Sequence, residues 1–123
     1  LKENAAKVIT GGPMMGVAQK SLNIPGVKGT SGILVLVKDE VEDYEPSPCI
    51  NCAKCVDACP MFLMPTQLVN YAKNEMVEEL EDWQVLSCIE CGSCSFVCPA
   101  KIPLVHYLRL GKAQVMAKKR EEN

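Results

Sequence analysis

Short apolar stretches separated by turns mark the first third of the chain. Apolar residues gather at 7–10 and 33–37, and turn signals stand at 11–13 and 29–32. Six of the eight glycines fall in this part of the chain. This pattern predicts short β-strands. Residues 1–37 are too few and too rich in glycine to bury a core alone, so we expect the end of a β-rich domain.

From Cys49 onward the chain changes to helical patterning. Between the two groups of cysteines, apolar residues recur at three- and four-residue steps, which predicts one amphipathic helix. Its apolar face consists of Leu68, Val69, Ala72, Met76, Leu80 and Trp83. Either Pro65 in the first turn or Thr66 as N-cap would begin it. A weaker helical spacing covers 104–116 and is interrupted at Gly111.

An acidic stretch with two prolines, 38–48, separates the two patterns and predicts a linker or loop. The net charge is only −2, but it is unevenly distributed. Residues 38–90 hold twelve acidic side chains against three basic ones, whereas 101–120 hold six basic and no acidic ones. This split suits docking to a partner of complementary charge. Cations near a helix C-terminus also favour the helix dipole, which is the simpler interpretation.

The chain begins with Leu1 and shows no charged leader followed by an apolar segment. We therefore expect a piece of a longer protein, without a signal peptide. The longest apolar run, 33–37, is far shorter than the roughly 20 residues that a membrane span needs. We expect no transmembrane segment in this chain and no nucleic-acid partner.

The eight cysteines fall into two tight groups of four, and each group reads Cys-x₂-Cys-x₂-Cys-x₃-Cys-Pro. Cysteines at this density indicate either disulfides or metal binding. Disulfide scaffolds spread their cysteines over loops, so the tight grouping favours metal. The first run is Cys49, Cys52, Cys55 and Cys59, and the second is Cys88, Cys91, Cys94 and Cys98.

Each run matches the one with which bacterial ferredoxins bind 4Fe–4S clusters. Three thiolates at two-residue spacing can wrap one face of a cubane, because the backbone between them curls around it. In two-cluster ferredoxins the fourth cysteine ligates the other cluster, and this resemblance implies the same crossed ligation here. Cluster 1 is then assigned to Cys49, Cys52, Cys55 and Cys98, and cluster 2 to Cys88, Cys91, Cys94 and Cys59.

Two zinc ions, each bound by four cysteines, are the alternative, and they would make the chain a zinc-stabilised interaction module. Zinc knuckles are usually Cys-x₂-Cys pairs a dozen or more residues apart, so two clusters that pass electrons are favoured.

We interpret His106, the only histidine, as a helix residue beside Tyr107. The glycine-rich stretch 11–16 lacks the lysine of a phosphate loop and is interpreted as a tight turn. We predict no catalytic residue.

The two runs belong to an internal repeat. Each run is followed by a short apolar segment, by a further proline at Pro65 or Pro103, and then by a predicted helix. Such a near-duplication predicts two equivalent metal sites related by a pseudo-two-fold axis.

The order of these features resembles the RnfC family, the C subunit of the Rnf (Rsx) ion-translocating ferredoxin:NAD oxidoreductase complex. The resemblance joins the glycine-rich turn at 11–16 to the cysteine runs at 48–60 and 88–105. It implies a mostly α fold, in which a two-cluster helical ferredoxin domain at 49–120 follows the 38–48 linker. Residues 1–37 would end a β-grasp domain of the soluble-ligand-binding type.

The same resemblance implies electron transfer within a membrane-associated complex on the cytoplasmic side of the cell membrane. The expected partners are the other subunits of the Rnf complex and redox proteins. FMN and NADH would bind only in an N-terminal part that this chain lacks, so the fragment alone is not expected to oxidise or reduce NAD. Iron–sulfur subunits of the cobalamin reductase or heterodisulfide reductase type carry a similar domain and are the alternative.

Overall fold

The computed structural model describes residues 3–42 and 44–123. The chain divides into two compact units, Leu1–Tyr44 and Glu45–Asn123. All eight cysteines belong to the second unit.

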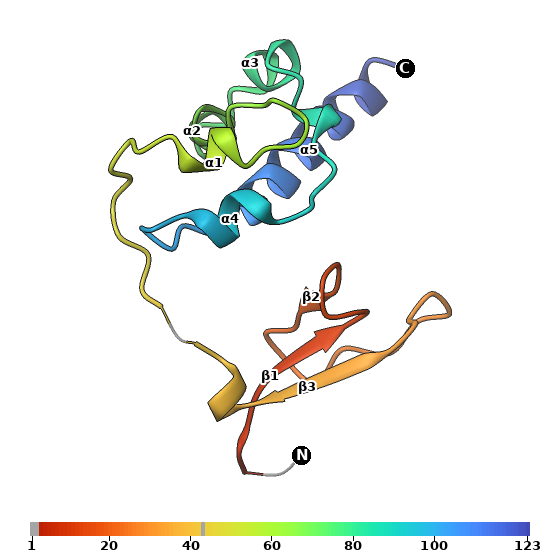
Figure 1. Ribbon diagram of the computed structural model, residues 1–123. Helices are drawn as coiled ribbons and strands as arrows, with labels where there is room; N and C mark the ends of the chain where they lie inside the picture. The colour runs from red at the N-terminus through yellow and green to blue at the C-terminus, as the bar shows by residue number, and fades with distance from the viewer. Residues whose placement is uncertain (1–2, 43) are drawn as a thin grey trace. The chain divides into compact units, whose positions relative to one another are not determined.

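In the described part of the first unit, three strands form an antiparallel sheet (Figure 1). The central strand is β1 (Ala5–Thr10), which lies between β2 (Val17–Ala18) and β3 (Ile33–Val37). Ile9 of β1 pairs with Leu34 of β3. β1 and β3 contain the two apolar stretches from which strands were predicted. β2 was not predicted, because a strand of two residues shows no periodicity.

The glycine-rich stretch between β1 and β2 forms a tight turn, as predicted. The Gly16 N–H donates to the carbonyl oxygen of Gly12 at 2.9 Å. A Cβ atom on Gly16 would lie 2.4 Å from that oxygen and 2.4 Å from Cγ2 of Ile9, so a larger residue does not fit. Gly11 has a φ of +106°, a conformation that favours glycine. The geometry of the turn therefore accounts for these glycines.

The acidic stretch predicted as a linker is structured at both ends. It begins with one 3₁₀ turn, η1 (Lys38–Glu40). The Glu40 carboxylate accepts a hydrogen bond from the Val37 N–H at 3.1 Å. Near the other end, which belongs to the second unit, the Ser47 N–H donates to the carbonyl oxygen of Ala100 at 2.9 Å.

The second unit is helical (Figure 1). Its elements are α1 (Lys54–Asp57), α2 (Pro65–Lys73), α3 (Val77–Asp82), η2 (Val85–Ser87), α4 (Ser93–Val97) and α5 (Leu104–Glu121). Helices α2 and α3 pack against the long helix α5, whereas α1 packs against α4. The cysteine runs therefore meet through α1 and α4, beside a scaffold of α2, α3 and α5.

The single helix predicted between the cysteine runs is wrong, because α2 and α3 are separated at 74–76. Glu75 has a φ of 55°, and a left-handed residue cannot continue a right-handed helix. The Met76 N–H donates to the carbonyl oxygen of Tyr71 at 3.0 Å, which closes the C-terminus of α2. At its other end α2 begins with Pro65 in the first turn, which is one of the two starts predicted.

Helix α5 continues through Gly111, where the sequence pattern is interrupted. A Cβ atom on Gly111 would lie 3.1 Å from Cδ2 of Leu80 and 3.3 Å from Cβ of Ala72. Glycine therefore allows α5 to approach α2 and α3 closely. Among the described residues, neither α5 nor any other helix combines the length and apolar character that a membrane crossing requires.

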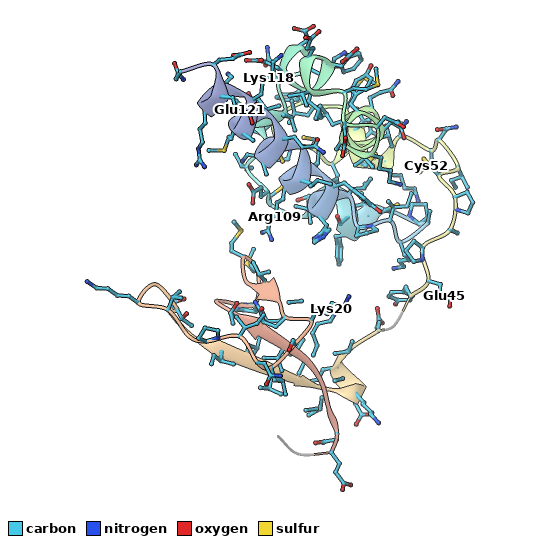
Figure 2. All side chains as sticks on the ribbon, turned by 180° about the vertical axis from the view of Figure 1, so that it is seen from behind. Lys20, Glu45, Cys52, Arg109, Lys118 and Glu121 are labelled. Atoms are coloured by element: carbon cyan, nitrogen blue, oxygen red, sulfur yellow. The ribbon has the colours of Figure 1, made fainter. Side chains whose placement is uncertain are left out.

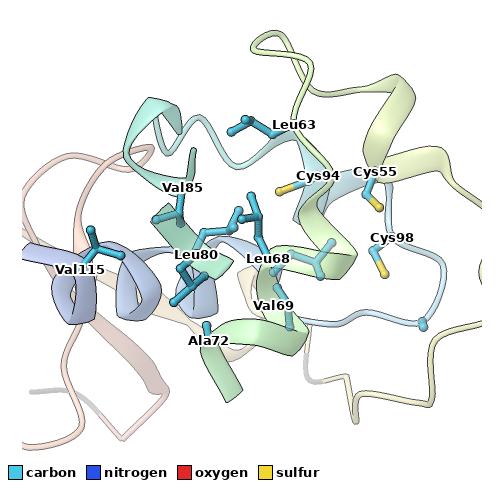
Figure 3. Packing of buried hydrophobic residues seen from close by; sticks show 13 residues of the cluster. Cys55, Leu63, Leu68, Val69, Ala72, Leu80, Val85, Cys94, Cys98 and Val115 are labelled. Carbon is cyan, nitrogen blue, oxygen red and sulfur yellow. The ribbon is translucent and has the colours of Figure 1, made fainter. Parts of the chain in front are cut away.

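The apolar core of the second unit lies between α2, α3 and α5 (Figure 3). The side chains with no exposed surface include Leu68, Leu80, Val85 and Val115. Figure 3 shows Cys55 and Cys98 toward one end of this cluster, Cys94 between them and Leu68, and Val115 at the other end. The packing that holds the helices together thus also positions these three thiols.

Candidate metal centres

The eight cysteines line two separate cavities in the second unit. Cavity 1 holds about 330 Å³ of atom-free space and cavity 2 about 350 Å³, part of each being open to solvent. The cysteines that line cavity 1 are Cys49, Cys52, Cys55 and Cys98. The cysteines that line cavity 2 are Cys59, Cys88, Cys91 and Cys94. Each cavity thus combines three cysteines of one run with the fourth cysteine of the other.

The backbone between the cysteines has the same conformation in both runs. Asn51 and Glu90, each two residues after the first cysteine of a run, have φ values of 55° and 57°. Ala53 and Gly92, two residues further on, have φ values of 60° and 80°. These left-handed residues turn the chain sharply, so cysteines close in sequence can face one cavity. The sequence repeat is therefore also a repeat of backbone conformation.

The same left-handed residues direct N–H groups at sulfur. The Asn51 N–H donates to Cys49 Sγ and the Glu90 N–H donates to Cys88 Sγ, in both cases at 3.4 Å. Hydrogen bonds to sulfur favour the thiolate over the thiol and adjust the potential of an iron–sulfur cluster. The left-handed backbone thus orients the cysteine side chains toward the cavities, and its N–H groups stabilise negative charge on the sulfur atoms.

The thiols differ in exposure. Cys55, Cys94 and Cys98 are buried, and Cys59 and Cys88 are half-buried. The exposed thiols are Cys49, Cys52 and Cys91. Both cavities therefore have a buried side within the protein and an exposed side at the surface, where Cys52 is labelled in Figure 2.

Burial controls the protonation of several thiols. Desolvation raises the pKa of Cys94 to about 11, and it also raises the pKa values of Cys55 and Cys88. A hydrogen bond with the Ser93 hydroxyl lowers the pKa of Cys91. Buried thiols of raised pKa stay protonated near neutral pH until a cationic group displaces their protons. The cavities are thus suited to thiolate ligands that form when metal binds.

The surroundings of the thiols fit a 4Fe–4S cluster. Apart from the cysteines, cavity 1 is lined by small or apolar side chains such as Ile50, Ile102 and Leu104. Cavity 2 is lined by apolar side chains such as Leu63 and Leu108 together with the charged Glu90. Among the residues that the structure describes, no three Cys, His, Asp or Glu side chains converge as they would on a single ion. In each cavity four thiols instead line one space, and a cubane has four iron atoms at its corners, each of which needs one thiolate ligand.

A group of charged side chains lies beside cavity 2. The Glu90 carboxylate accepts hydrogen bonds from Arg109 Nε and Lys112 Nζ of α5, each at 2.8 Å. Lys112 Nζ also donates to the carbonyl oxygen of Cys88 at 2.9 Å. The Lys112 hydrogen bond, and then that of Arg109, hold the pKa of Glu90 below its usual value. The sequence analysis did not predict this group. The sequence signals for it were an acidic residue, Glu90, between two cysteines, and two basic residues, Arg109 and Lys112, at helical spacing.

Part of the charge split found in the sequence is used within the second unit. Lys118 Nζ lies 3.6 Å from Oε1 of Glu78, and Lys119 Nζ lies 2.7 Å from Oε1 of Glu81. These ion pairs connect the end of α5, where Lys118 is labelled in Figure 2, to α3. Residues of the acidic and basic stretches therefore form ion pairs between α3 and α5 within the second unit.

His106 is exposed on α5, with its ring 6.4 Å from that of Tyr107 in an edge-to-face arrangement. It belongs to the lining of neither cavity. Its interpretation as a helix residue beside Tyr107 is confirmed.

The chain is similar to a known domain family and to segments of longer known proteins. A 4Fe–4S dicluster domain matches residues 42–99. The chain is 49% identical over 117 residues to the C subunit of the Na⁺-translocating ferredoxin:NAD⁺ oxidoreductase complex of Acetobacterium woodii, and the alignment covers 95% of this chain and 26% of that relative. It is 55% identical over 67 residues to the C subunit of the proton-translocating ferredoxin:NAD⁺ oxidoreductase complex of Clostridium ljungdahlii, where the alignment covers 54% and 15%.

A third relative is the C subunit of the ion-translocating oxidoreductase complex of Yersinia pestis, which is 47% identical over 116 residues. The alignment covers 94% of this chain and 19% of that relative. The chain thus spans about a quarter or less of the length of these curated relatives.

Proposed function

This chain is homologous to one segment of the C subunits of ion-translocating ferredoxin:NAD oxidoreductase complexes, and from that premise we propose that it transfers electrons through two 4Fe–4S clusters within such a complex. A bound cluster supplies a one-electron redox couple. The chain supplies the thiolates, the N–H groups that stabilise them, and the apolar surroundings that limit the access of water.

The lining of the two cavities is the observation that carries this proposal. We assign cluster 1 to cavity 1, with Cys49, Cys52, Cys55 and Cys98 as ligands, and cluster 2 to cavity 2, with Cys88, Cys91, Cys94 and Cys59 as ligands. These sets agree with the crossed ligation of two-cluster ferredoxins. Neither cavity has four thiols unless both runs are folded.

The burial pattern supports a relay between the clusters. The buried thiols Cys55 and Cys94 belong to α1 and α4, which pack against each other. The buried sides of the two cavities therefore lie close to one another, whereas Cys52 and Cys91 bring an exposed edge of each cavity to the surface. An electron that enters at one edge can leave at the other through the packed interior.

The remaining parts take their proposed roles from the homology. Residues 49–120 form the two-cluster helical ferredoxin domain, 38–48 the linker, and 1–37 the end of a β-grasp domain, to which the three described strands would belong. FMN and NADH would bind in other parts of the parent protein. Its partners would be the other subunits of the complex and redox proteins, with the chain held peripherally on the cytoplasmic side of the cell membrane.

Metal content tests the proposed function. Anaerobically reconstituted protein is expected to hold about eight irons per chain, with visible absorbance that dithionite bleaches. A colourless protein with one zinc ion for every four cysteines would refute it and support the zinc-stabilised alternative.

Two quadruple variants with the same number of cysteines test the ligand sets. In both, Cys49, Cys52 and Cys55 are replaced by alanine. Adding Cys98→Ala leaves the whole ligand set of cluster 2 intact, whereas adding Cys59→Ala removes one of its ligands. Crossed ligation predicts about four irons per chain in the first variant and fewer in the second. Equal iron contents, or the reverse order, would contradict the assignment.

A further inference from the structure

The two cysteine runs repeat in backbone but differ in charge at one position. Asn51 and Glu90 are equivalent in the repeat, and both donate their N–H to the sulfur of the preceding cysteine at 3.4 Å. Asn51 is neutral, and its amide oxygen lies 3.7 Å from Cys49 Sγ. Glu90 instead directs its carboxylate at Arg109 and Lys112 of α5. The pseudo-two-fold symmetry of the sites is therefore broken by charge beside cavity 2.

The geometry keeps these charges close to cavity 2. Lys112 Nζ bridges the Glu90 carboxylate at 2.8 Å and the carbonyl oxygen of Cys88 at 2.9 Å. Cys88 and Glu90 both line the cavity. The side chains of Arg109, Lys112 and Glu90 are between 21% and 29% exposed, so solvent screens them only in part. Two cations against one anion leave a net positive charge at this place.

Charges beside cavity 2 change the reduction potential of a cluster in that cavity through electrostatic interaction. Reduction adds one electron to a cluster, so a neighbouring cation favours the reduced form and a neighbouring anion favours the oxidised form. Because the charges lie beside cavity 2, their effect is expected to fall mainly on one of the two clusters.

We propose that Arg109, Glu90 and Lys112 set the reduction potential of cluster 2 separately from that of cluster 1, Lys112 and Arg109 raising it and Glu90 lowering it. The inference rests on the proposed function, since it requires clusters in the cavities. It assigns the three side chains a role in tuning a redox step, beyond the mechanical role of joining the second run to α5.

Charge-neutralising variants of opposite sign test the proposal. The cluster-loaded full chain is titrated anaerobically with a reductant, and the two one-electron steps are followed by electron paramagnetic resonance. Lys112→Gln is expected to move one step to lower potential, and Glu90→Gln to move the same step to higher potential. The expected size is a roughly tenfold change in the ratio of reduced to oxidised cluster at fixed ambient potential, the order that a partly buried unit charge produces. The other step stays in place.

Two control variants accompany them. Lys112→Arg keeps the cation and is expected to leave both steps near their original potentials. Lys119→Gln removes a cation from the same helix, but one whose partner is Glu81 of α3, which lines neither cavity, whereas the partner of Lys112 is the cavity-lining Glu90. It is expected to move neither step.

Shifts of the same sign in Lys112→Gln and Glu90→Gln would overturn the inference, because a purely mechanical clamp loosens in either case. Equal movement of both steps, or no movement, would overturn it as well. If Lys112→Gln loses iron, Arg109→Gln provides the cationic arm, since it leaves the Lys112 bond to Cys88 in place. Missing iron in the unmodified chain would refute the proposed function itself, whereas normal iron with unmoved potentials refutes only this inference.

Discussion

Replacing Gly111 with alanine is expected to destabilise the second unit, although alanine is the better helix former. In a helix interior the exchange contributes about 1 kcal/mol of stability through propensity alone. The new Cβ would lie 3.1 Å from Leu80 Cδ2 and 3.3 Å from Ala72 Cβ. Leu80 is 0% and Ala72 1% exposed, so neither can move aside freely. Overpacking of this kind costs about 1–3 kcal/mol, which leaves a net loss of about 1 kcal/mol.

Shortening Leu80 should reverse the sign of the effect. Leu80→Ala alone is expected to cost about 2–5 kcal/mol, because it leaves a cavity in the core. In that background the contacts of the added Cβ with the Leu80 side chain are gone and only the 3.3 Å contact with Ala72 Cβ remains, so most of the propensity gain of about 1 kcal/mol should appear. The two substitutions should therefore couple favourably by about 1–3 kcal/mol, which the assay detects as opposite shifts of the unfolding midpoint in the two backgrounds. Ala113→Gly, at an exposed position of the same helix, measures the propensity effect alone.

The assay is anaerobic guanidinium unfolding of the cluster-loaded chain, followed by circular dichroism and visible absorbance together. Cluster loss makes unfolding irreversible, so midpoints are compared after a fixed incubation instead of being extrapolated to free energies. Gly111→Ala should lower the midpoint in the original chain and raise it in Leu80→Ala. An increase in the original chain, or equal decreases in both backgrounds, would refute the account of Gly111 as a packing requirement.

Three further outcomes are expected. Removal of the clusters should abolish order around both cysteine runs, because metal-binding free energy is folding free energy at such sites; an amide spectrum as dispersed as that of the loaded chain would contradict this. Ala53→Gly should raise the unfolding midpoint, because it relieves a backbone strain of roughly 1 kcal/mol. Ala53 has a φ of 60°, and the second cysteine run has a glycine, Gly92, at the equivalent position. The hydrogen bond from Lys119 lowers the pKa of Glu81, so carbon-detected titration should find this pKa below the ordinary glutamate value and Lys119→Gln should return it. The stabilisation from that pair is present at neutral pH and is lost as the pH falls through the lowered pKa.

The chemistry of the site could be predicted from the sequence because it depends on residue type and spacing. Cysteine runs with the ferredoxin spacing are rare enough to indicate clusters by themselves. The backbone that makes this spacing work could not be predicted. Asn51, Ala53 and Glu90 all adopt left-handed conformations that are usually associated with glycine. Gly92, and more weakly Asn51, give a local signal of such a conformation, whereas Ala53 and Glu90 give none.

The helices show the same division between local and tertiary causes. Periodicity found the buried residues of α2 and α3, but its predicted face also held Met76 and Trp83, which are exposed at the two ends of α3. It joined α2 to α3 as well, because glutamate at 75 is a good helix former and carries no sign of a break. It also treated Gly111 as an interruption, because the closeness of Leu80 and Ala72 exists only in the packed unit. The approach of Arg109 and Lys112 to Glu90 depends on the same packing, across 19 and 22 residues of sequence.

The crossed lining of the cavities links these local features to the whole second unit. Cavity 1 takes Cys98 from the chain just after α4, and cavity 2 takes Cys59 from the chain just after α1. Each fourth thiol therefore reaches its cavity only when the two runs lie against each other. The core between α2, α3 and α5 adjoins Cys55, Cys94 and Cys98, so the packing that excludes water also positions thiols from both runs. For this reason the apolar core of the second unit, including the close approach of Gly111 to Leu80, is a condition for forming either site.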